Sequence, residues 1–188
     1  MEKIKELLSK YSYLKGVAYF IVILLASHFL WKLSFIEGKD LSGLPQIFLW
    51  RSYDVSYLFN TAVGFLSSQV NWLIHDVFNM DVVKLNAAFY VKEISSLVKI
   101  VWSCSGLKQI FVFFCIIAFY PGSEKNKLWF IPLGILLIWI LNVIRISTLI
   151  ALFEQFPNHF DSFHELSKYV FYFVIFMFWV FWEEKVRK

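Results

Sequence analysis

Four long apolar runs, separated by polar segments, constrain this chain more than any other feature of its sequence. They cover about residues 17–36, 103–120, 128–153 and 165–182. A helix needs about 20 apolar residues to cross the hydrocarbon core of a bilayer, and each run is close to that length. With 59% apolar and only 17% charged residues, the chain is too hydrophobic for an ordinary soluble domain. We therefore expect one all-α integral membrane domain over residues 1–188, built as a four-span helical bundle.

The first apolar run has a signal peptide as its competing interpretation, because residues 1–16 form a basic segment in front of it. The cleavage site would be poor, since the small residues Ala26 and Ser27 are followed by four bulky side chains. We therefore expect an uncleaved first spanning helix over 17–36, preceded by a basic amphipathic arm.

Residues 37–102 are too polar to cross the membrane and form an insert between the first two spans. A cluster of Gly, Pro and charged residues predicts a loop over 37–52. Over 54–79, apolar residues recur at helical spacing among polar ones, which is typical of an amphipathic helix lying on a membrane or against other helices. The mixed composition of 81–102 predicts a short strand pair or extended segments leading to Cys104.

Basic residues at the ends of the apolar runs predict the topology. Lys and Arg concentrate in the N-terminal arm, in the 121–127 loop and in the C-terminal tail, and short cytoplasmic loops are enriched in these residues. All three segments are cytoplasmic only if four helices span the membrane and 54–79 does not. The alternative, with 54–79 spanning, places the 121–127 loop and the tail outside. We favour the first topology, in which 37–102 is extracytoplasmic.

Composition and cysteine count exclude several other classes. The net charge of +4 resides mostly at the ends of the apolar runs rather than in a basic, aromatic groove, so no nucleic-acid partner is expected. Two cysteines cannot build a disulfide framework, and Cys104 and Cys115 would lie roughly 16 Å apart on one continuous helix. Both should be free thiols. No Cys/His cluster has zinc spacing, and no metal or cofactor is expected.

The predicted topology brings three polar residues to one depth near the outer membrane face. Cys104 lies at the outer start of the second span, and His164 at the outer start of the fourth. Arg145 lies in the third span, about eight residues or roughly 12 Å below its outer end, and its long side chain reaches toward the nearer surface. The topology depends on lysines elsewhere in the chain, so this convergence is an independent result.

A thiol and an imidazole at one depth suggest nucleophilic catalysis. Cys104 precedes an apolar helix whose positive dipole end favours the thiolate form, although a small buried side chain is the plainer alternative and our interpretation of Cys115. His164 can take the thiol proton and return it to a leaving amine. Its alternatives are a solvated loop-end histidine and replacement in this role by His159.

The remaining polar residues can support that chemistry. An intramembrane Arg usually faces the protein interior or water, and the guanidinium of Arg145 can hold an oxyanion or a carboxylate. Asn142, one turn earlier, can share its face. The structural alternative is that Arg145 snorkels or pairs with Glu154 or Asp161. Asp161 is also a candidate to orient the His164 imidazole.

Glu165, directly after His164, is the second candidate for orienting that imidazole.

The order of three motifs resembles the exosortase/archaeosortase family of prokaryotic membrane cysteine enzymes. The motifs are Cys104-Ser105-Gly106-Leu107 opening one span, Asn142-Val143-Ile144-Arg145-Ile146 in the next, and His164 before the last. The resemblance covers about residues 80–182, and the chain resembles a short variant of the family. It implies that Cys104 is the nucleophile, Arg145 the stabiliser and His164 the acid/base. Ser105 and Asn142, within the same motifs, are expected to contact substrate.

The resemblance also implies substrates and location. Substrates are expected to be secreted proteins that end in a short motif, a transmembrane helix and a basic tail. The enzyme would be a multi-pass protein of the bacterial inner membrane, surrounded by lipid, with its active site facing the periplasm or exterior. It would cut beside the motif as a thiol peptidase or transpeptidase.

Two other function classes compete with this hypothesis. A non-catalytic scaffold with the same fold would bind or stabilise a partner membrane protein and would not need Cys104. A transporter would need more polar residues facing one another across the spans than this sequence carries.

Overall fold

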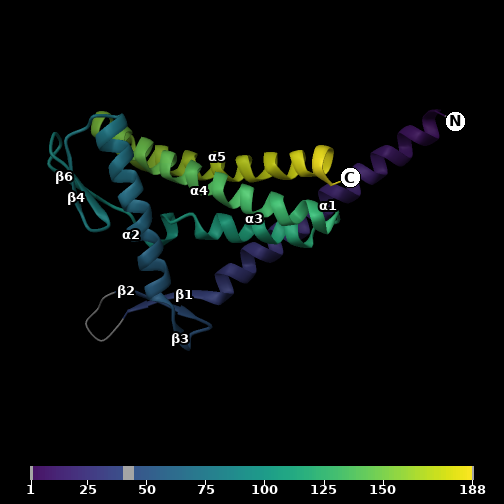
Figure 1. Ribbon diagram of the computed structural model, residues 1–188, viewed down its shortest axis with the longest axis horizontal. Coiled ribbons are helices and arrows are strands. Elements are labelled where there is room, and N and C mark those ends of the chain that lie inside the picture. The colour runs from purple at the N-terminus through teal and green to yellow at the C-terminus, as the bar shows by residue number, and fades with distance from the viewer. Residues whose placement is uncertain (1, 40–44, 188) are drawn as a thin grey trace.

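The computed structural model describes residues 2–39 and 45–187 and shows a mostly helical protein (Figure 1). Three helices, α3 (Leu107–Phe119), α4 (Glu124–Gln155) and α5 (Phe160–Phe181), lie side by side and pack on one another. Helix α1 (Glu2–Ser34) packs against α3. The two termini lie at the end of this bundle that is opposite to the strands (Figure 1).

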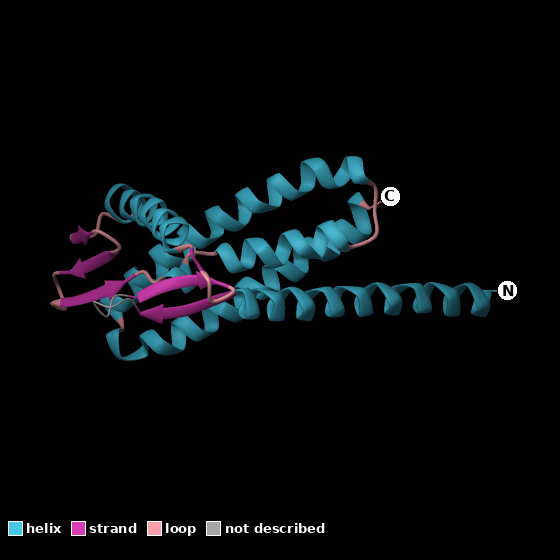
Figure 2. Cartoon of the chain, turned by 90° about the horizontal axis from the view of Figure 1, so that it is seen from below, coloured by secondary structure: helices cyan, strands magenta, loops and turns pink. Residues whose placement is uncertain are grey.

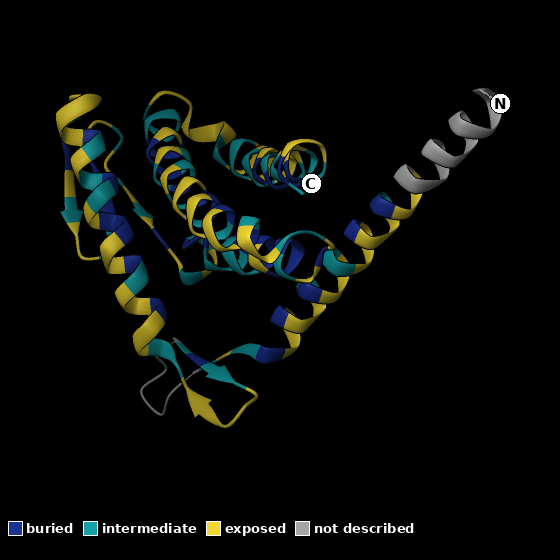
Figure 3. Cartoon of the chain, turned by 45° about the vertical axis from the view of Figure 1, so that its right-hand side comes forward, coloured by how far each residue is buried: buried dark blue, intermediate teal, exposed yellow. Residues whose placement is uncertain are grey.

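Helix α1 joins the predicted basic arm and the first apolar run into one continuous element of 33 residues. Its apolar part, Leu14–Ser34, is long enough to cross a membrane. Its exposed face carries large apolar side chains such as Val22, Leu25 and Leu33, whereas Phe20 and Trp31 are buried against the rest of the protein (Figure 3). Exposed apolar surface of this extent on a helix is suited to contact with lipid rather than water.

The main core lies between α3, α4 and α5, where apolar side chains from each helix interlock. Gly134 of α4 allows the closest approach, since a β-carbon there would lie 2.1 Å from the Phe113 ring of α3. Small residues at helix contacts are a common means of close packing in membranes. The fully buried members include Val112, Phe113, Ile116, Ile117, Ile138, Ile175, Trp179 and Trp182.

Three helical segments of the described chain are long and apolar enough to cross a membrane. These are Leu14–Ser34, Glu124–Gln155 and Pro157–Val186. The fourth predicted span, 103–120, corresponds to α3, which has 13 residues and is therefore about 20 Å long. This is shorter than the hydrocarbon core of about 30 Å. The assignment as a membrane protein therefore rests on three long apolar helices, and α3 is a shorter apolar helix packed among them.

The prediction of a loop over 37–52 is wrong where the structure describes this segment. Strands β1 (Phe35–Lys39) and β2 (Pro45–Leu49) pair antiparallel, and β3 (Tyr53–Asp54) adds a short third strand. The remainder of that loop, 40–44, lies outside the described residues. Gly and Pro suggested a loop, but the apolar Phe35 and Ile47 pack with Trp31 of α1 and tie the strand pair to the end of that helix.

The predicted amphipathic helix within 54–79 forms as α2 (Ser56–Trp72), extended by a π-helical turn at Leu73–Val77. One face, with Phe59, Val63, Leu66 and Val70, is buried, and the opposite face is exposed (Figure 3). The buried positions recur every three or four residues, which is the period of one helix face. Helix α2 lies across one end of the bundle and packs on α4 (Figure 1).

The segment predicted as a strand pair before Cys104 is a three-stranded antiparallel sheet. It consists of β4 (Val82–Leu85), β5 (Ala88–Val91) and β6 (Ser96–Lys99). The inner side chains Val82 and Phe89 are buried against α2 and α4. Figure 2 shows both sheets at the same end of the molecule, away from the N-terminus. The chain leaves β6 directly into the turn that carries Cys104.

Candidate active site

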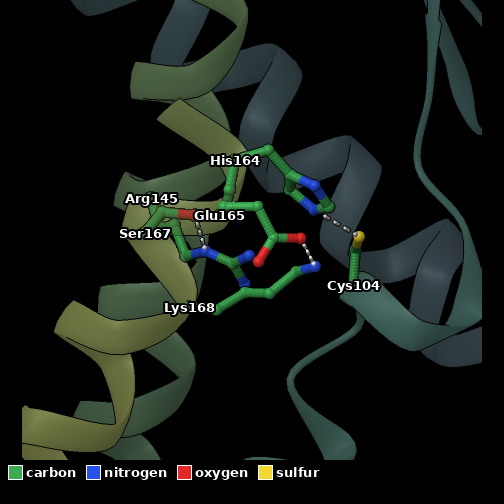
Figure 4. Close-up of polar contacts among 6 residues, drawn as sticks. All are labelled: Cys104, Arg145, His164, Glu165, Ser167 and Lys168. Atoms are coloured by element: carbon green, nitrogen blue, oxygen red, sulfur yellow. Dashed lines mark hydrogen bonds and ion pairs between the residues drawn. The ribbon is translucent and has the colours of Figure 1, made fainter. Parts of the chain in front are cut away.

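Cys104 lies in a 3₁₀ turn, Trp102–Cys104, immediately before α3. The predicted continuous helix through Cys104 and Cys115 is therefore wrong, because Gly106 adopts a left-handed φ of +81° that separates the turn from the helix. Both cysteines are free thiols, with Cys104 partly exposed and Cys115 buried. The break turns the Cys104 side chain out of the α3 helix and toward α5 (Figure 4).

The structure brings Cys104 and His164 together. The Cys104 Sγ atom lies 3.8 Å from Nε2 of His164, which is within hydrogen-bonding range for sulfur (Figure 4). His164 lies in the second turn of α5, which begins at Phe160, and not in a loop before that helix. The imidazole stacks on the Phe160 ring, with ring centroids 6.1 Å apart. Helix α5 thus fixes both the position and the tilt of the imidazole.

His159, the competing histidine, lies in the short 3₁₀ turn Pro157–His159 and is exposed. Its ring contacts Phe163, and the thiol contact described above is made by His164. Of the two candidate carboxylates, Glu165 pairs with Lys168 at 2.6 Å (Figure 4). Both Glu165 and Asp161 lie close enough to the His164 imidazole to act on it electrostatically.

Arg145 is held by neutral groups rather than by a carboxylate. Its Nε donates to Ser167 Oγ at 2.9 Å, and one terminal nitrogen donates to Asn142 Oδ1 at 3.4 Å. The guanidinium also lies over the Phe171 ring, 5.6 Å from its centroid. Within residues 2–39 and 45–187, neither Glu154 nor Asp161 forms an ion pair with it. The charge of Arg145 therefore has no counter-ion among these residues.

A chain of hydrogen bonds joins the three predicted residues through two others. Asn142 Nδ2 donates to the Cys104 carbonyl at 3.0 Å and receives the Arg145 hydrogen bond on its oxygen. Ser167 accepts from Arg145 and donates to the His164 carbonyl at 2.7 Å. Helices α4 and α5 and the Cys104 turn are thereby fixed relative to one another.

Ser167 is the residue that sequence reasoning missed. It lies three positions after His164, so it shares a helix face with that residue, and it is a hydroxyl within an apolar run. A hydroxyl three positions after His164 could therefore have been predicted to lie near the site.

Ser105 and Asn142, predicted to contact substrate, are both buried, with exposed fractions of 1% and 0%. The Ser105 hydroxyl accepts a hydrogen bond from the Leu107 amide at 3.4 Å. Asn142 has both ends of its amide occupied, as described above. In this structure the two side chains hold the backbone around Cys104 in place.

An apolar groove runs between α4 and α5, and Arg145 lies part-way along it. Its volume is about 330 Å³. Arg145, Thr148 and Ser167 supply its polar groups, and the other lining residues are apolar. The lining residues are Leu141, Ile144, Arg145, Thr148, Leu149, Leu152, Phe163, Leu166, Ser167, Val170, Phe171 and Val174. The groove therefore offers hydrocarbon contact along its length and one cation.

Comparison with known protein families identifies the family of the chain. The model of the transmembrane exosortase family matches residues 6–182, which is nearly the whole chain. The chain belongs to the transmembrane exosortase family. Neither the curated proteins nor the solved structures provide a match. The predicted resemblance is thereby confirmed, and it extends well upstream of residue 80. Exosortase membership implies a membrane protein with a transpeptidase role in protein sorting.

Among the described residues, no group of three or more His, Cys, Asp and Glu side chains is arranged to hold a metal ion. What this exosortase presents at one point is a thiol, an imidazole and a guanidinium from three separate elements.

Proposed function

We propose that this exosortase is a membrane cysteine transpeptidase that cleaves C-terminal sorting signals of secreted proteins. The observation that carries the proposal is the 3.8 Å contact between Cys104 Sγ and His164 Nε2, beside a guanidinium with no counter-ion among the described residues. A nucleophile paired with a base, next to a charge that can stabilise an oxyanion, is the minimum set for acyl transfer.

In the first half of the reaction, His164 Nε2 accepts the Sγ proton of Cys104, and the thiolate attacks the carbonyl carbon of the scissile peptide. The carbonyl oxygen becomes an oxyanion, which the Arg145 guanidinium stabilises. When this intermediate collapses, the C–N bond breaks and the leaving amine takes the proton from the His164 imidazolium. The product is a thioester on Cys104.

In the second half, an acceptor amine or water attacks the thioester carbonyl and gives a proton to His164. The C–S bond then breaks, and the Cys104 sulfur recovers the proton. An amine acceptor completes transpeptidation, and water completes hydrolysis. The same three side chains therefore serve both halves, and the acceptor alone decides the outcome.

Arg145 is positioned for its role by neutral partners. A carboxylate partner would cancel its charge, whereas Ser167 and Asn142 hold the guanidinium through hydrogen bonds and leave its charge available. It lies close enough to Cys104 for the two side chains to interact electrostatically. Arg145 is therefore the proposed oxyanion stabiliser.

The groove between α4 and α5 is the proposed site of the apolar anchor of the substrate. It is lined mostly by hydrocarbon, and Arg145 lies part-way along it, next to the helix turn that carries His164. An anchor segment lying in the part of the groove on the Leu141 and Val174 side of Arg145 would place the peptide bond before it near the guanidinium. The expected substrates are secreted proteins that end in a short motif, a transmembrane helix and a basic tail.

The proposed orientation places the Cys104 end of the bundle outside the bacterial inner membrane. In this topology α1, α3, α4 and α5 cross, α2 and both sheets are extracytoplasmic, and the basic 121–127 loop and the tail are cytoplasmic. Helix α3 is shorter than the other three, so Tyr120 and the 3₁₀ turn would complete its crossing. The sheets and α2 would then cover the site at the outer surface.

The test is processing of a tagged substrate co-expressed with the enzyme, measured as a mobility shift on gels. The substrate is an exported protein with a C-terminal motif, helix and basic tail, taken from a neighbouring gene. Cys104→Ala is expected to abolish processing, whereas Cys115→Ala, a matched change at the buried thiol, is expected to leave it intact. Processing that survives Cys104→Ala would refute the proposal and favour a non-catalytic scaffold.

A further inference from the structure

A second cavity lies between the end of α1 and the start of α3, on the other side of the Cys104 turn. Its volume is about 350 Å³, which is in the range of a small ligand site. It is distinct from the α4–α5 groove and shares no lining residue with it. The lining residues are His28, Trp31, Lys32, Phe35, Trp102, Ser103 and Lys108.

The charges in this cavity are all of one kind. Lys32 and Lys108 lie close enough to repel one another, and both act on His28. In the part of the chain that the structure describes, neither lysine forms an ion pair. The carboxylate of Glu37 accepts a hydrogen bond from the Trp102 indole at 3.2 Å. Gathering unpaired like charges is unfavourable unless an anion compensates them.

The position of the cavity is that of a membrane interface. Lys32 lies in the last turn of α1, at the end of its apolar part, where Phe29, Leu30 and Leu33 are more than half exposed. Aromatic rings at the level of the headgroups are typical of membrane proteins, and here Trp31, Phe35 and Trp102 form the cavity wall. A ligand with an anionic head in the cavity and hydrocarbon chains on the exposed face of α1 would compensate the lysine charges and cover the apolar side chains.

We propose that this cavity binds the phosphate headgroup of an anionic phospholipid. Lys32 and Lys108 supply the positive charge, and the Ser103 hydroxyl can donate a hydrogen bond to a phosphate oxygen. The acyl chains lie against Phe29, Leu30 and Leu33. An acidic peptide would also bring a negative charge to the two lysines. It would leave the exposed apolar face beside the cavity uncovered, whereas the acyl chains of a lipid would cover it.

A bound headgroup would connect the Cys104 turn to the two helices beside it. Trp102 and Ser103 belong to the segment that ends at Cys104, Lys32 to α1 and Lys108 to the first turn of α3. The proposal depends on α1 lying in a bilayer and does not depend on the chemistry of Cys104. Binding can therefore be measured without any activity.

The test is lipid retention by the full-length protein, reconstituted in bilayers of equal phosphatidylglycerol and phosphatidylcholine and measured by native mass spectrometry after release. The wild type is expected to retain more phosphatidylglycerol than phosphatidylcholine. In Lys32→Gln/Lys108→Gln, the affinity should fall about fivefold for each lysine, or about 25-fold in all. Lys32→Arg/Lys108→Arg keeps both charges and should retain the lipid, which shows that loss in the Gln variant is not misfolding.

The matched control is Lys84→Gln/Lys125→Gln, which removes two charges outside the cavity lining, one from the half-buried Lys84 and one from the exposed Lys125. It should retain phosphatidylglycerol at the level of the wild type. The proposal is overturned if both double Gln variants lose the lipid equally, or if Lys32→Gln/Lys108→Gln keeps it. Two further arms add inorganic phosphate or a short acidic peptide. Full displacement of the lipid by free phosphate, or charge-dependent binding of the peptide without lipid retention, would also overturn it.

Discussion

Asn142 of α4 lies so close to Gly106 that a β-carbon on the glycine would be 2.9 Å from Asn142 Nδ2. Gly106 also has a φ of +81°, a conformation that L-residues with side chains adopt at a cost. Two independent constraints therefore require glycine two positions after Cys104. The same contact lets Asn142 reach the Cys104 carbonyl, so the backbone shape and the site geometry depend on each other.

Gly106→Ala should therefore be destabilising and should reduce substrate processing. The left-handed backbone alone is expected to cost about 1–2 kcal/mol, and the displaced Asn142 would release the Cys104 carbonyl. Thermal unfolding in detergent and the processing assay measure the two effects. Gly64→Ala is the control, because a β-carbon there meets nothing within 4 Å and α2 should gain about 0.5–1 kcal/mol. Equal behaviour of the two variants would contradict the argument.

His164→Ala should reduce processing by at least about 100-fold, because the thiol loses its proton acceptor. His159→Ala should change processing little, since the His159 ring is exposed and contacts Phe163 instead. Both variants are compared in membranes that contain equal amounts of the enzyme. A larger defect in His159→Ala than in His164→Ala would reverse the assignment of the base.

Asn142→Asp separates the two hydrogen bonds of this side chain. Aspartate keeps an oxygen for Arg145 but loses the donor to the Cys104 carbonyl, and its negative charge compensates the guanidinium. Processing should fall sharply, while the protein stays folded with a loss of about 0.6 kcal/mol for the missing hydrogen bond. Asn60→Ala, at an exposed position of α2, should lie within about 0.5 kcal/mol of the wild type. Full activity of Asn142→Asp would show that Arg145 needs no free charge.

Labelling with a membrane-impermeant maleimide tests both thiol access and orientation. In intact spheroplasts, wild type and Cys115→Ala should be modified, because Cys104 is partly exposed and belongs to the proposed outer end. Cys104→Ala should not be modified, since Cys115 is only 5% exposed and lies within α3. Mass spectrometry of the labelled peptide identifies the site. Labelling of Cys104 only after permeabilisation would place the site on the cytoplasmic side and refute the topology.

The sequence predicted the long helices and the meeting of Cys104 with His164 because both depend on strong signals. Apolar runs of this length mark helices α1, α4 and α5, and the chain order fixes which helix ends lie together. The family was predicted from the same ordered motifs and is confirmed by the match over 6–182.

The strands and the details of the site were harder to predict, since they depend on contacts between distant residues. The β1–β2 pair is stabilised by the apolar cluster of Trp31, Ile47 and Phe59, which the turn-forming composition of 37–52 concealed. The break between Cys104 and α3 follows from one backbone angle at Gly106. Ser167 acquires its role only because Arg145 lies opposite it on another helix.

The pairing of residues 60 positions apart also sets an order of events during synthesis. Cys104 leaves the ribosome before α4 and α5, and His164 belongs to α5. At about 5–20 residues per second, the thiol precedes its imidazole by about 3–12 s. Under the proposed chemistry, a nascent chain is therefore inert toward neighbouring proteins in the translocation machinery, and it acquires activity only when α5 docks.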